Sequence, residues 1–356
     1  MSHTDHTPVM LRESLQALAV GPGGRYVDGT TGAGGHARAI LDMSAPGGQL
    51  LGLDADPESL KIASENLSGY EGSFRLVNAN FSRMEEICRQ YDFYPVHGII
   101  LDLGLASMQL TETGRGFSFQ YDAPLDMRFS PDQKLTAAEI VNTWSETEIA
   151  DILYRYGEER RSRAIARRIV ESRPLKTTTQ LANLVAKTIG RSGDIHPATR
   201  TFQALRIAVN DELARLEDTL DQAVRLLGYS GRLVVIAYHS LEDRIVKQFF
   251  QREATDCVCP VELPECRCGH VARLRVLNRK VMTPTDEEVR ANPRARSARL
   301  RAAERILSRP ENEELPRKDF FLNKADYNVT DRHCLEAGIP TLCAPGATPL
   351  KGRSAM

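Results

Sequence analysis

Three acidic residues stand where the chain leaves a short apolar run, and each could contact a small ligand. Asp28 precedes a glycine-rich turn (DGTTGAGGH), Asp54 ends the run LLGLD, and Asp102 ends the run GIILD. Glycines let a backbone turn sharply and approach a ligand closely, and the following helix offers free N–H groups. Asp54 comes 20 residues after Gly34, the spacing at which a carboxylate can accept both hydroxyls of a ribose. These features predict a nucleotide-like cofactor site.

Asp28 distinguishes between two cofactors that such a site can hold. The turn also matches the dinucleotide fingerprint through Gly32, Gly34 and Ala37, so the glycines alone leave NAD and S-adenosylmethionine both open. A carboxylate directly before the turn would repel a pyrophosphate but attract the cationic amino-acid end of S-adenosylmethionine. The sequence therefore favours S-adenosylmethionine, with an Asp28 that merely caps the turn as the alternative.

Two other residues follow predicted strands. Phe81 comes after the run FRLVNAN, where it could pack on an adenine face, although core packing is the commoner fate of a Phe. Asp102 is expected to project towards the reacting centre, because ligands bind at the carboxyl ends of strands in open α/β sheets.

The elements that position these residues alternate between strand-like and helix-like segments. Residues 24–30, 49–54, 74–79 and 96–105 read as buried strands, with helices at 36–43, 57–67 and 82–91. This alternation predicts a parallel sheet wound with helices. A long loop then covers 109–132, residues 135–228 read almost entirely as helix, and a strand returns at 231–240. We therefore expect an α/β core in 1–108 and in 229–308, the latter with a basic C-terminal helix, a loop and helical insertion in 109–228, and a flexible tail in 309–356.

The composition excludes several classes of protein. The 356 residues are 42% hydrophobic and 26% charged, too apolar for wholesale disorder. No apolar run approaches the ~20 residues that span a bilayer, and the start MSHTDHTPVM lacks the pattern of a signal peptide. We therefore expect a cytoplasmic protein without a membrane partner, of unspecified oligomeric state.

Nucleic-acid binding would have to come from local clusters, because 46 Lys and Arg nearly balance 47 Asp and Glu. Residues 155–176 hold eight Lys and Arg against three Glu, and residues 273–301 hold nine against three acids. Solvated helix faces are the alternative explanation of both clusters. Four arginines in the second cluster have few acids beside them and are the better RNA candidates: Arg294, Arg296, Arg299 and Arg301.

Four of the seven cysteines crowd into one short segment. Cys257, Cys259, Cys266 and Cys268 form two Cys-x-Cys pairs separated by six residues. Thiolates at this spacing could hold one structural Zn²⁺, although the common zinc pairing is Cys-x₂-Cys. Reduced free thiols or redox-labile pairs are the alternative.

A series of motifs runs along the chain in a recognisable order. They are HTPVML from residue 6, DGT and GGH in the turn at 28–36, DLG and QL at 102–110, RGFSF from 115, PLDMR from 124, YGEER from 156, HPATR from 196, HSLEDR from 239, and NPR with RSA at 292–298. Together they closely resemble the RsmH family, also called MraW, over about residues 5–307. One departure is Ala106, where the family usually has serine.

The resemblance implies a Rossmann-like class I methyltransferase sheet with an inserted all-helical domain. It implies a bacterial enzyme that uses S-adenosylmethionine to methylate N4 of a cytidine in the decoding region of 16S ribosomal RNA, within the small ribosomal subunit. The cofactor contacts that it assigns by motif are Gly34, Gly35, His36, Asp54, Phe81, Asp102 and Gln109.

The residues themselves favour N4 over C5 methylation of cytosine. C5 methylation requires a thiolate that attacks the ring, and no Cys lies on the predicted strand-end loops. Asp102, or a backbone carbonyl beside it in the turn DLGLAS, is the candidate acceptor for the N4 amino hydrogens. Arg115, Phe117 and Phe119 on the long loop are candidates to receive an unstacked base. A methyltransferase acting on other RNA or DNA, a non-catalytic binding module and a nicotinamide dehydrogenase stay open as competitors.

Overall fold

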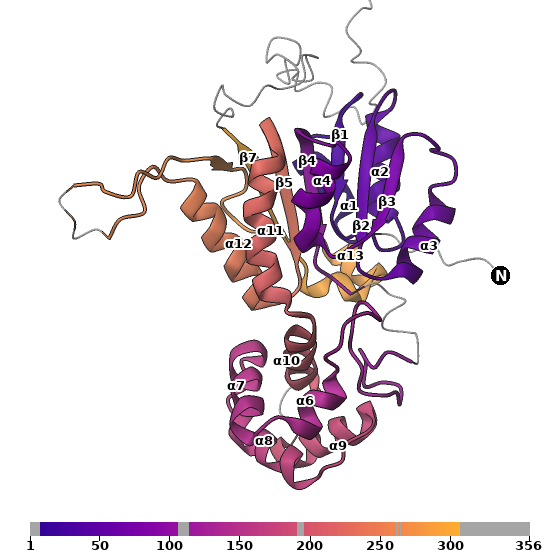
Figure 1. Cartoon of the computed structure of the whole chain (residues 1–356), viewed down its shortest axis with the longest axis vertical. Helices are drawn as coiled ribbons and strands as arrows, with labels where there is room; N and C mark the ends of the chain where they lie inside the picture. Colours follow the sequence, from indigo (N-terminus) through magenta and orange to yellow (C-terminus); the bar gives the residue numbers. More distant parts are fainter. Residues whose placement is uncertain (1–7, 106–113, 191–195, 261–262, 264, 307–356) are drawn as a thin grey trace, which may run out of the picture. The chain divides into compact units, whose positions relative to one another are not determined.

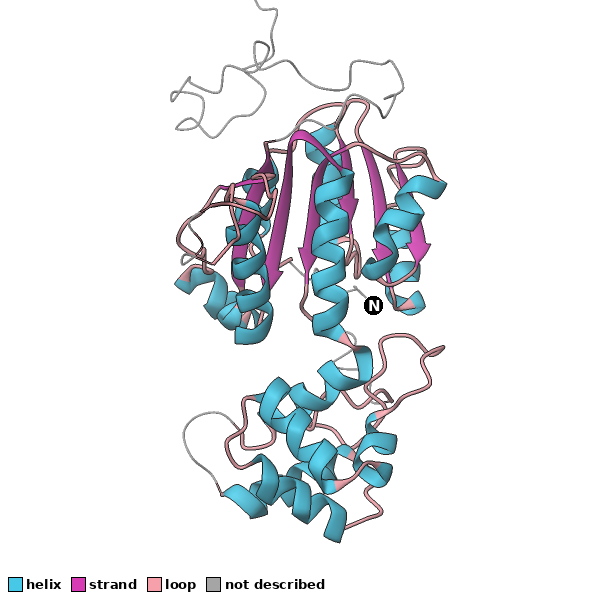
Figure 2. Ribbon diagram, turned by 60° about the vertical axis from the view of Figure 1, so that its left-hand side comes forward, coloured by secondary structure: helices cyan, strands magenta, loops and turns pink. Residues whose placement is uncertain are grey.

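A seven-stranded sheet with the strand order β3-β2-β1-β4-β5-β7-β6 forms the centre of the fold (Figure 1 and Figure 2). The computed structural model describes residues 8–105, 114–190, 196–260, 263 and 265–306. Strands β1 to β5 are parallel, whereas β7 is antiparallel to both β5 and β6. The strands are β1 Arg25–Asp28, β2 Gln49–Asp54, β3 Phe74–Asn78, β4 Val96–Asp102, β5 Leu227–Ala237, β6 Leu274–Val276 and β7 Arg299–Arg305.

Helices cover both faces of the sheet because side chains of its central strands are buried on both sides. Val27 of β1 belongs to the core beneath α4, α11 and α12, whereas its neighbour Tyr26 belongs to the core beneath α1 and α2. This two-sided burial explains why the strands read as continuous apolar runs. The helices around the sheet are α1 Leu11–Leu18, α2 Gly35–Ser44, α3 Pro57–Asn66, α4 Met84–Gln90, α11 Glu212–Leu226, α12 Ser240–Glu253 and α13 Asp286–Ala291, with 3-10 turns η1 Phe81–Arg83 and η2 Pro293–Ser297.

The inserted helices enclose a separate hydrophobic core. Their buried residues run from Phe117 to Val209, and capping boxes at Ser145 and Thr177 start two of the helices. They are α6 Ala137–Thr143, α7 Glu146–Gly157, α8 Ser162–Glu171, α9 Thr178–Ile189 and α10 Thr199–Asn210. The predicted α/β sheet with an all-helical insertion is therefore the architecture of the described chain.

The end of the insertion differs from the predicted boundary at 228. The expected continuous helix from 197 to 227 is divided at Asp211, which has a left-handed φ of 51°. The second half, α11, places Leu216 and Leu220 in the core of the sheet. Packing therefore assigns α11 to the α/β part, and the insertion's own core ends with α10.

The predicted basic C-terminal helix is wrong. Residues 299–305 form β7, which pairs with β5 from Arg299 opposite Ala237 to Glu304 opposite Arg232. Successive side chains point to opposite faces of the sheet, with Leu300 and Ala302 in the core beside α1 and α2 and Ala303 in the core on the other face. Arginines on the other positions obscured this two-residue period.

The chain divides into two compact units, Met1–Arg309 and Pro310–Met356. The second unit, and with it the tail predicted for 309–356, lies outside the described residues. Within the described part, no helix combines the length and the apolarity needed to cross a membrane.

Candidate active site

The glycine-rich turn after β1 lies at the carboxyl ends of the central strands, where its backbone is hydrogen-bonded to β2 and β4. Gly32 and Gly34 have left-handed φ values of 53° and 87°, which side-chain-bearing residues rarely adopt. Gly34 is the residue before α2, and a Cβ on Gly35 would meet Pro8 at 2.4 Å. The turn therefore requires glycine, and it leaves the N-terminus of α2 at the carboxyl edge of the sheet.

Asp54, the last residue of β2, fixes the glycine turn to the neighbouring strand. One carboxylate oxygen accepts the N–H of Gly32 at 2.8 Å, and the other accepts the N–H of Asp56 at 2.8 Å. Burial raises the pKa of Asp54 to about 6, although both N–H donors favour the charged form. Each oxygen keeps a second lone pair, so the carboxylate can also accept a pair of ligand hydroxyls.

Asp28 is a buried carboxylate with an unpaired oxygen. Its side chain lies at the end of β1 and only 1% of the residue is exposed. The Oδ1 atom accepts the N–H of Thr30 at 3.1 Å, whereas Oδ2 has no hydrogen-bond partner among the described residues. Burial, reinforced by the nearby Asp102 and Asp54, raises the pKa of Asp28 to about 7. A buried carboxylate oxygen without a hydrogen-bond partner is energetically unfavourable, so this oxygen is suited to bind a cation or a hydrogen-bond donor of a ligand.

Asp102 ends β4 and lies within the same group of acids. Its backbone N–H donates to the Thr30 hydroxyl at 2.6 Å, and Oδ1 accepts the N–H of Gly104 at 3.4 Å. Tyr238 is the residue after β5, and its hydroxyl donates a hydrogen bond to the Asp102 carboxylate. Burial raises the pKa of Asp102, because the opposing contributions of His36 and Tyr238 are smaller. The side chain is 20% exposed, so it reaches the surface of the site.

His36 supports this acidic group from the first turn of α2. Its Nε2 lies 3.2 Å from the Val9 carbonyl oxygen, which can only accept, so Nε2 carries the proton. The Nδ1 atom is 3.8 Å from Asp102, and burial lowers the pKa of the imidazole. The buried, neutral imidazole therefore packs beside the Asp102 carboxylate.

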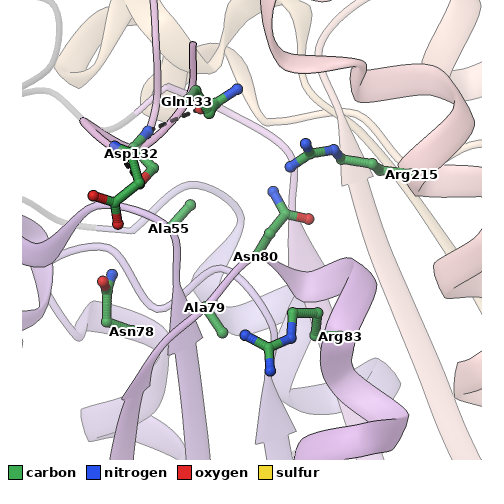
Figure 3. Close-up of a pocket in the computed structure, with 9 residues that line it drawn as sticks. Ala55, Asn78, Ala79, Asn80, Arg83, Asp132, Gln133 and Arg215 are labelled. Carbon is green, nitrogen blue, oxygen red and sulfur yellow. Dashed lines mark hydrogen bonds between the residues drawn. The ribbon is translucent and has the colours of Figure 1, made fainter.

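A cavity of about 190 Å³ opens beside Ala55, the residue after β2, between the ends of β2 and β3 and the long loop of the insertion (Figure 3). Arg83 and Arg215 extend from opposite sides of Asn80 in this view. Phe81, for which core packing and contact with an adenine were both open, is partly buried and packs against the sheet core. The cavity is lined by Ala55, Asn78, Ala79, Asn80, Arg83, Ser130, Asp132, Gln133 and Arg215.

Two of the residues that are candidates to receive a base, Phe117 and Phe119, stack on other aromatic rings. Phe117 is 7% exposed and stacks on Phe129, with ring centroids 5.5 Å apart. Phe119 stacks on His196 with centroids 4.6 Å apart. The hydrophobic core of the insertion explains both positions, and it corrects the assignment of Phe117 as an open stacking platform.

Arg115 connects the insertion to the cofactor side of the sheet. Its guanidinium pairs with Asp56, just beyond the end of β2, and donates to the Arg128 carbonyl at 2.9 Å. A second connection is made by Glu158 at the end of α7, which accepts from Ser240 at 2.7 Å and Arg244 at 2.8 Å. Both contacts hold the insertion at the carboxyl edge, where the acids lie.

The four candidate RNA-binding arginines divide into two pairs. Arg299 and Arg301 lie 3.4 Å and 2.6 Å from Asp243 of α12, so an acid that is distant in the sequence pairs with both. Arg294 and Arg296 are exposed on η2 and make no ion pair among the residues that the structure describes. Ala295 between them packs in the same core as Val9 and Tyr238.

Sequence reasoning missed Thr30 and Tyr238 as members of the site. Tyr238 directly follows β5, so the strand-end rule that selects Asp102 also selects it. Thr30 lies inside the DGT motif, but its bond to Asp102 joins residues 72 positions apart. Gln109, Ala106 and the following serine lie outside the described residues.

The sheet order, the glycine turn and the acids at the ends of β1, β2 and β4 define a class I methyltransferase that uses S-adenosylmethionine. The orphaned Asp28 oxygen fits the cofactor's cationic amino-acid end, and Asp54 fits its ribose hydroxyls. Residues 3–306 match the model of the MraW methylase family, and the chain belongs to that family.

Relatives are similar over nearly the whole chain. A ribosomal RNA small subunit methyltransferase H from Dehalococcoides mccartyi (strain ATCC BAA-2266 / KCTC 15142 / 195) is 59% identical, over 95% of this chain and 95% of that protein. A ribosomal RNA small subunit methyltransferase H from Thermomicrobium roseum is 55% identical, over 85% of this chain and 94% of that protein. A solved rRNA methylase from Streptococcus thermophilus has a TM-score of 0.38 and 10% identity, covering 85% of this chain and 99% of that chain.

Proposed function

We propose that this methyltransferase transfers a methyl group from S-adenosylmethionine to N4 of a cytidine in the decoding region of 16S ribosomal RNA. The names of relatives that are 55–59% identical support ribosomal RNA of the small subunit as the substrate. The structural observation that carries the proposal is the group formed by Asp28, Asp54 and Asp102 at one edge of the sheet.

Asp28 and Asp54 hold the two ends of the cofactor. When bound, S-adenosylmethionine supplies a methyl group on a sulfonium, activated for in-line displacement. The free Oδ2 of Asp28 accepts from the ammonium of the amino-acid end, which also compensates the buried negative charge. Asp54 accepts the ribose hydroxyls while its N–H donors keep the carboxylate oriented.

Asp102 acts on the substrate amino group. The lone pair of a cytosine N4 is delocalised into the ring, so an acceptor for its hydrogens increases its nucleophilicity as the new bond forms. A carboxylate with a raised pKa is a stronger acceptor and can take the proton that N4 loses on methylation. Tyr238, Gly104 and the backbone bond to Thr30 keep this carboxylate in one orientation.

The cysteines argue for nitrogen rather than carbon as the methyl acceptor. Attack on C5 of cytosine would require a thiolate beside the cofactor. Among the described residues, Cys88 is buried in α4 and burial raises its pKa to about 12, while the other four lie between α12 and β6. The described carboxyl edge therefore offers carboxylates but no thiol.

The insertion and the exposed arginines supply the RNA side of the proposal. Arg115 and Glu158 hold the helical insertion at the carboxyl edge, and Arg294 and Arg296 present two cations on η2. Phosphate contacts of this kind position RNA without reading its sequence. We assign substrate recognition to the insertion and place the reaction on the small ribosomal subunit in the cytoplasm.

The test measures where the methyl group goes. Purified protein is incubated with radiolabelled S-adenosylmethionine and, in separate reactions, 30S particles lacking the modification, naked 16S RNA and duplex DNA, and nucleosides are analysed by mass spectrometry. We expect N4-methylcytidine from one decoding-region position, with Asp102→Asn as the inactive control. Modification at C5, or incorporation into DNA alone, would contradict the proposal.

A further inference from the structure

The segment between α12 and β6 is not used by the methyl-transfer site. It leaves the sheet as an extended loop, seen in orange-brown in Figure 1, and it carries two Cys-x-Cys pairs. Cys257, Cys266 and Cys268 are exposed and Cys259 is partly buried, and all four are free thiols. These four thiols therefore require a role of their own.

The distances between the sulfurs match a shared metal ion. All four Sγ atoms lie within 4.8 Å of one another, with Cys266 and Cys268 at 3.6 Å and Cys257 and Cys268 at 3.9 Å. Four sulfurs held tetrahedrally at about 2.3 Å from one Zn²⁺ lie about 3.8 Å apart. A disulfide would bring two sulfurs to about 2.05 Å. The arrangement therefore has the dimensions of a tetrahedral metal site and not those of paired disulfides.

The backbone around the cysteines also has the form of a metal-binding turn. The N–H groups of Val258 and His270 donate to Cys268 Sγ at 3.4 Å and 3.5 Å, and the N–H of Arg267 donates to Cys259 Sγ at 3.4 Å. Gly269, which follows the last cysteine, has a left-handed φ of 60° that directs the next N–H back to the sulfur. Such donors orient and stabilise metal-bound thiolates.

In the part of this loop that the structure describes, the outer end has no hydrophobic core to hold it together. Three of its described apolar residues are exposed: Val258 by 44%, Leu263 by 44% and Val271 by 54%. Its base is closed by hydrogen bonds, because His270 Nδ1 lies 2.8 Å from the Thr255 carbonyl and Arg273 N–H donates to the Glu253 carbonyl at 2.8 Å. Beyond this base, one ion bound by all four sulfurs would link the two Cys-x-Cys segments of the loop to each other.

We propose that Cys257, Cys259, Cys266 and Cys268 bind one structural Zn²⁺. Four soft thiolate ligands select zinc over magnesium or calcium. Four protein ligands leave no open position for substrate or water, so the ion is structural and not catalytic. Its role is to close the outer end of the loop between α12 and β6. This assignment does not depend on the RNA substrate.

The experiment determines metal content and ligands in the full-length protein, produced in zinc-supplemented medium. Elemental analysis should give one zinc per chain, and X-ray absorption should give four sulfurs at about 2.3 Å. Replacing all four cysteines by serine should abolish bound zinc, whereas Cys88→Ala, the matched control in α4, should retain it. Chelation should release the metal and increase the rate of trypsin cleavage after Arg267, which is already exposed, while cofactor affinity stays within twofold.

Two results would overturn the assignment. One is wild-type protein without zinc in which all four thiols react freely. The other is non-reducing mass spectrometry that finds disulfides among these cysteines. Both measurements use the parent chain, so they stand even when the serine variant fails to fold.

Discussion

The backbone N–H of Asp102 donates to the hydroxyl of Thr30 at 2.6 Å, which joins the end of β4 to the glycine turn after β1. Thr30 in turn donates its own N–H to Asp28. Thr30 therefore contacts both Asp28, which we propose to bind the cofactor's cationic end, and Asp102, which we propose to act on the substrate amino group.

Thr30→Val should separate the alignment of the site from cofactor binding. Valine keeps the shape of threonine but leaves the Asp102 N–H without its acceptor, at a cost of about 1–3 kcal/mol in the free energy of unfolding. We expect kcat to fall about tenfold or more, because small displacements at a reacting centre are costly. The dissociation constant of the cofactor should change less than threefold. Thr30→Ser, which keeps the hydroxyl, should restore kcat.

Asp102→Asn should keep the fold and lose most of the methyl transfer. The amide retains the shape and an oxygen for Gly104, but it removes the acceptor charge and the raised pKa of the carboxyl. Single-turnover rates at saturating cofactor should fall by at least a hundredfold. Turnover at the parental rate with normal cofactor binding would show that Asp102 is structural.

Asp54→Ala should weaken cofactor binding far more than RNA binding. The substitution removes the acceptor for the ribose hydroxyls and releases the N–H groups of Gly32 and Asp56 from the carboxylate. The loss of a charge-assisted pair corresponds to roughly 1.5–3 kcal/mol, or about 10- to 150-fold in the dissociation constant. Calorimetry with S-adenosylhomocysteine measures this change, and unchanged affinity would remove Asp54 from the cofactor site.

Asp28→Asn should stabilise the cofactor-free protein at pH 8 and abolish cofactor binding. The folded pKa of about 7 lies above the ordinary 3.8, so the folded protein holds this proton more tightly than the unfolded chain does. The protonated Asp28 therefore contributes fully to the free energy of unfolding below pH 4, and this contribution is lost as the pH rises from about 4 to 7. The variant removes that loss, raising the free energy of unfolding by on the order of 2–4 kcal/mol at pH 8 and little near pH 4.

Urea unfolding at the two pH values checks this prediction, with the exposed Asp151→Asn as the control. The parent should also bind S-adenosylmethionine more weakly as the pH falls below 7, because protonation removes the charge that attracts the ammonium. A variant that is no more stable than the parent at pH 8 would contradict the buried, uncompensated charge at Asp28.

Local patterns predict the central sheet and the strand-end acids, since carboxyl ends of neighbouring parallel strands share one edge. Contacts between distant segments are not visible in such patterns. Asp243 pairs with Arg299 and Arg301, which are 56 and 58 residues further along the chain, so no local acid indicated their partner. The same holds for Arg115, whose pairing with Asp56 depends on how the insertion folds back on β2.

Replacing Arg294 and Arg296 by glutamine should weaken RNA binding and flatten its salt dependence without changing cofactor affinity. Both side chains are exposed on η2, and for every phosphate that the variant no longer neutralises the log-log salt slope should fall by ~0.7–0.9. The matched control replaces Arg275 and Arg299, also exposed but paired with Glu304 and Asp243. It removes the same charge and should leave the slope nearly parallel to that of the parent. Filter-binding titrations with 16S RNA measure all three proteins, and equal slopes for both double variants would move the RNA surface to the basic residues 155–176.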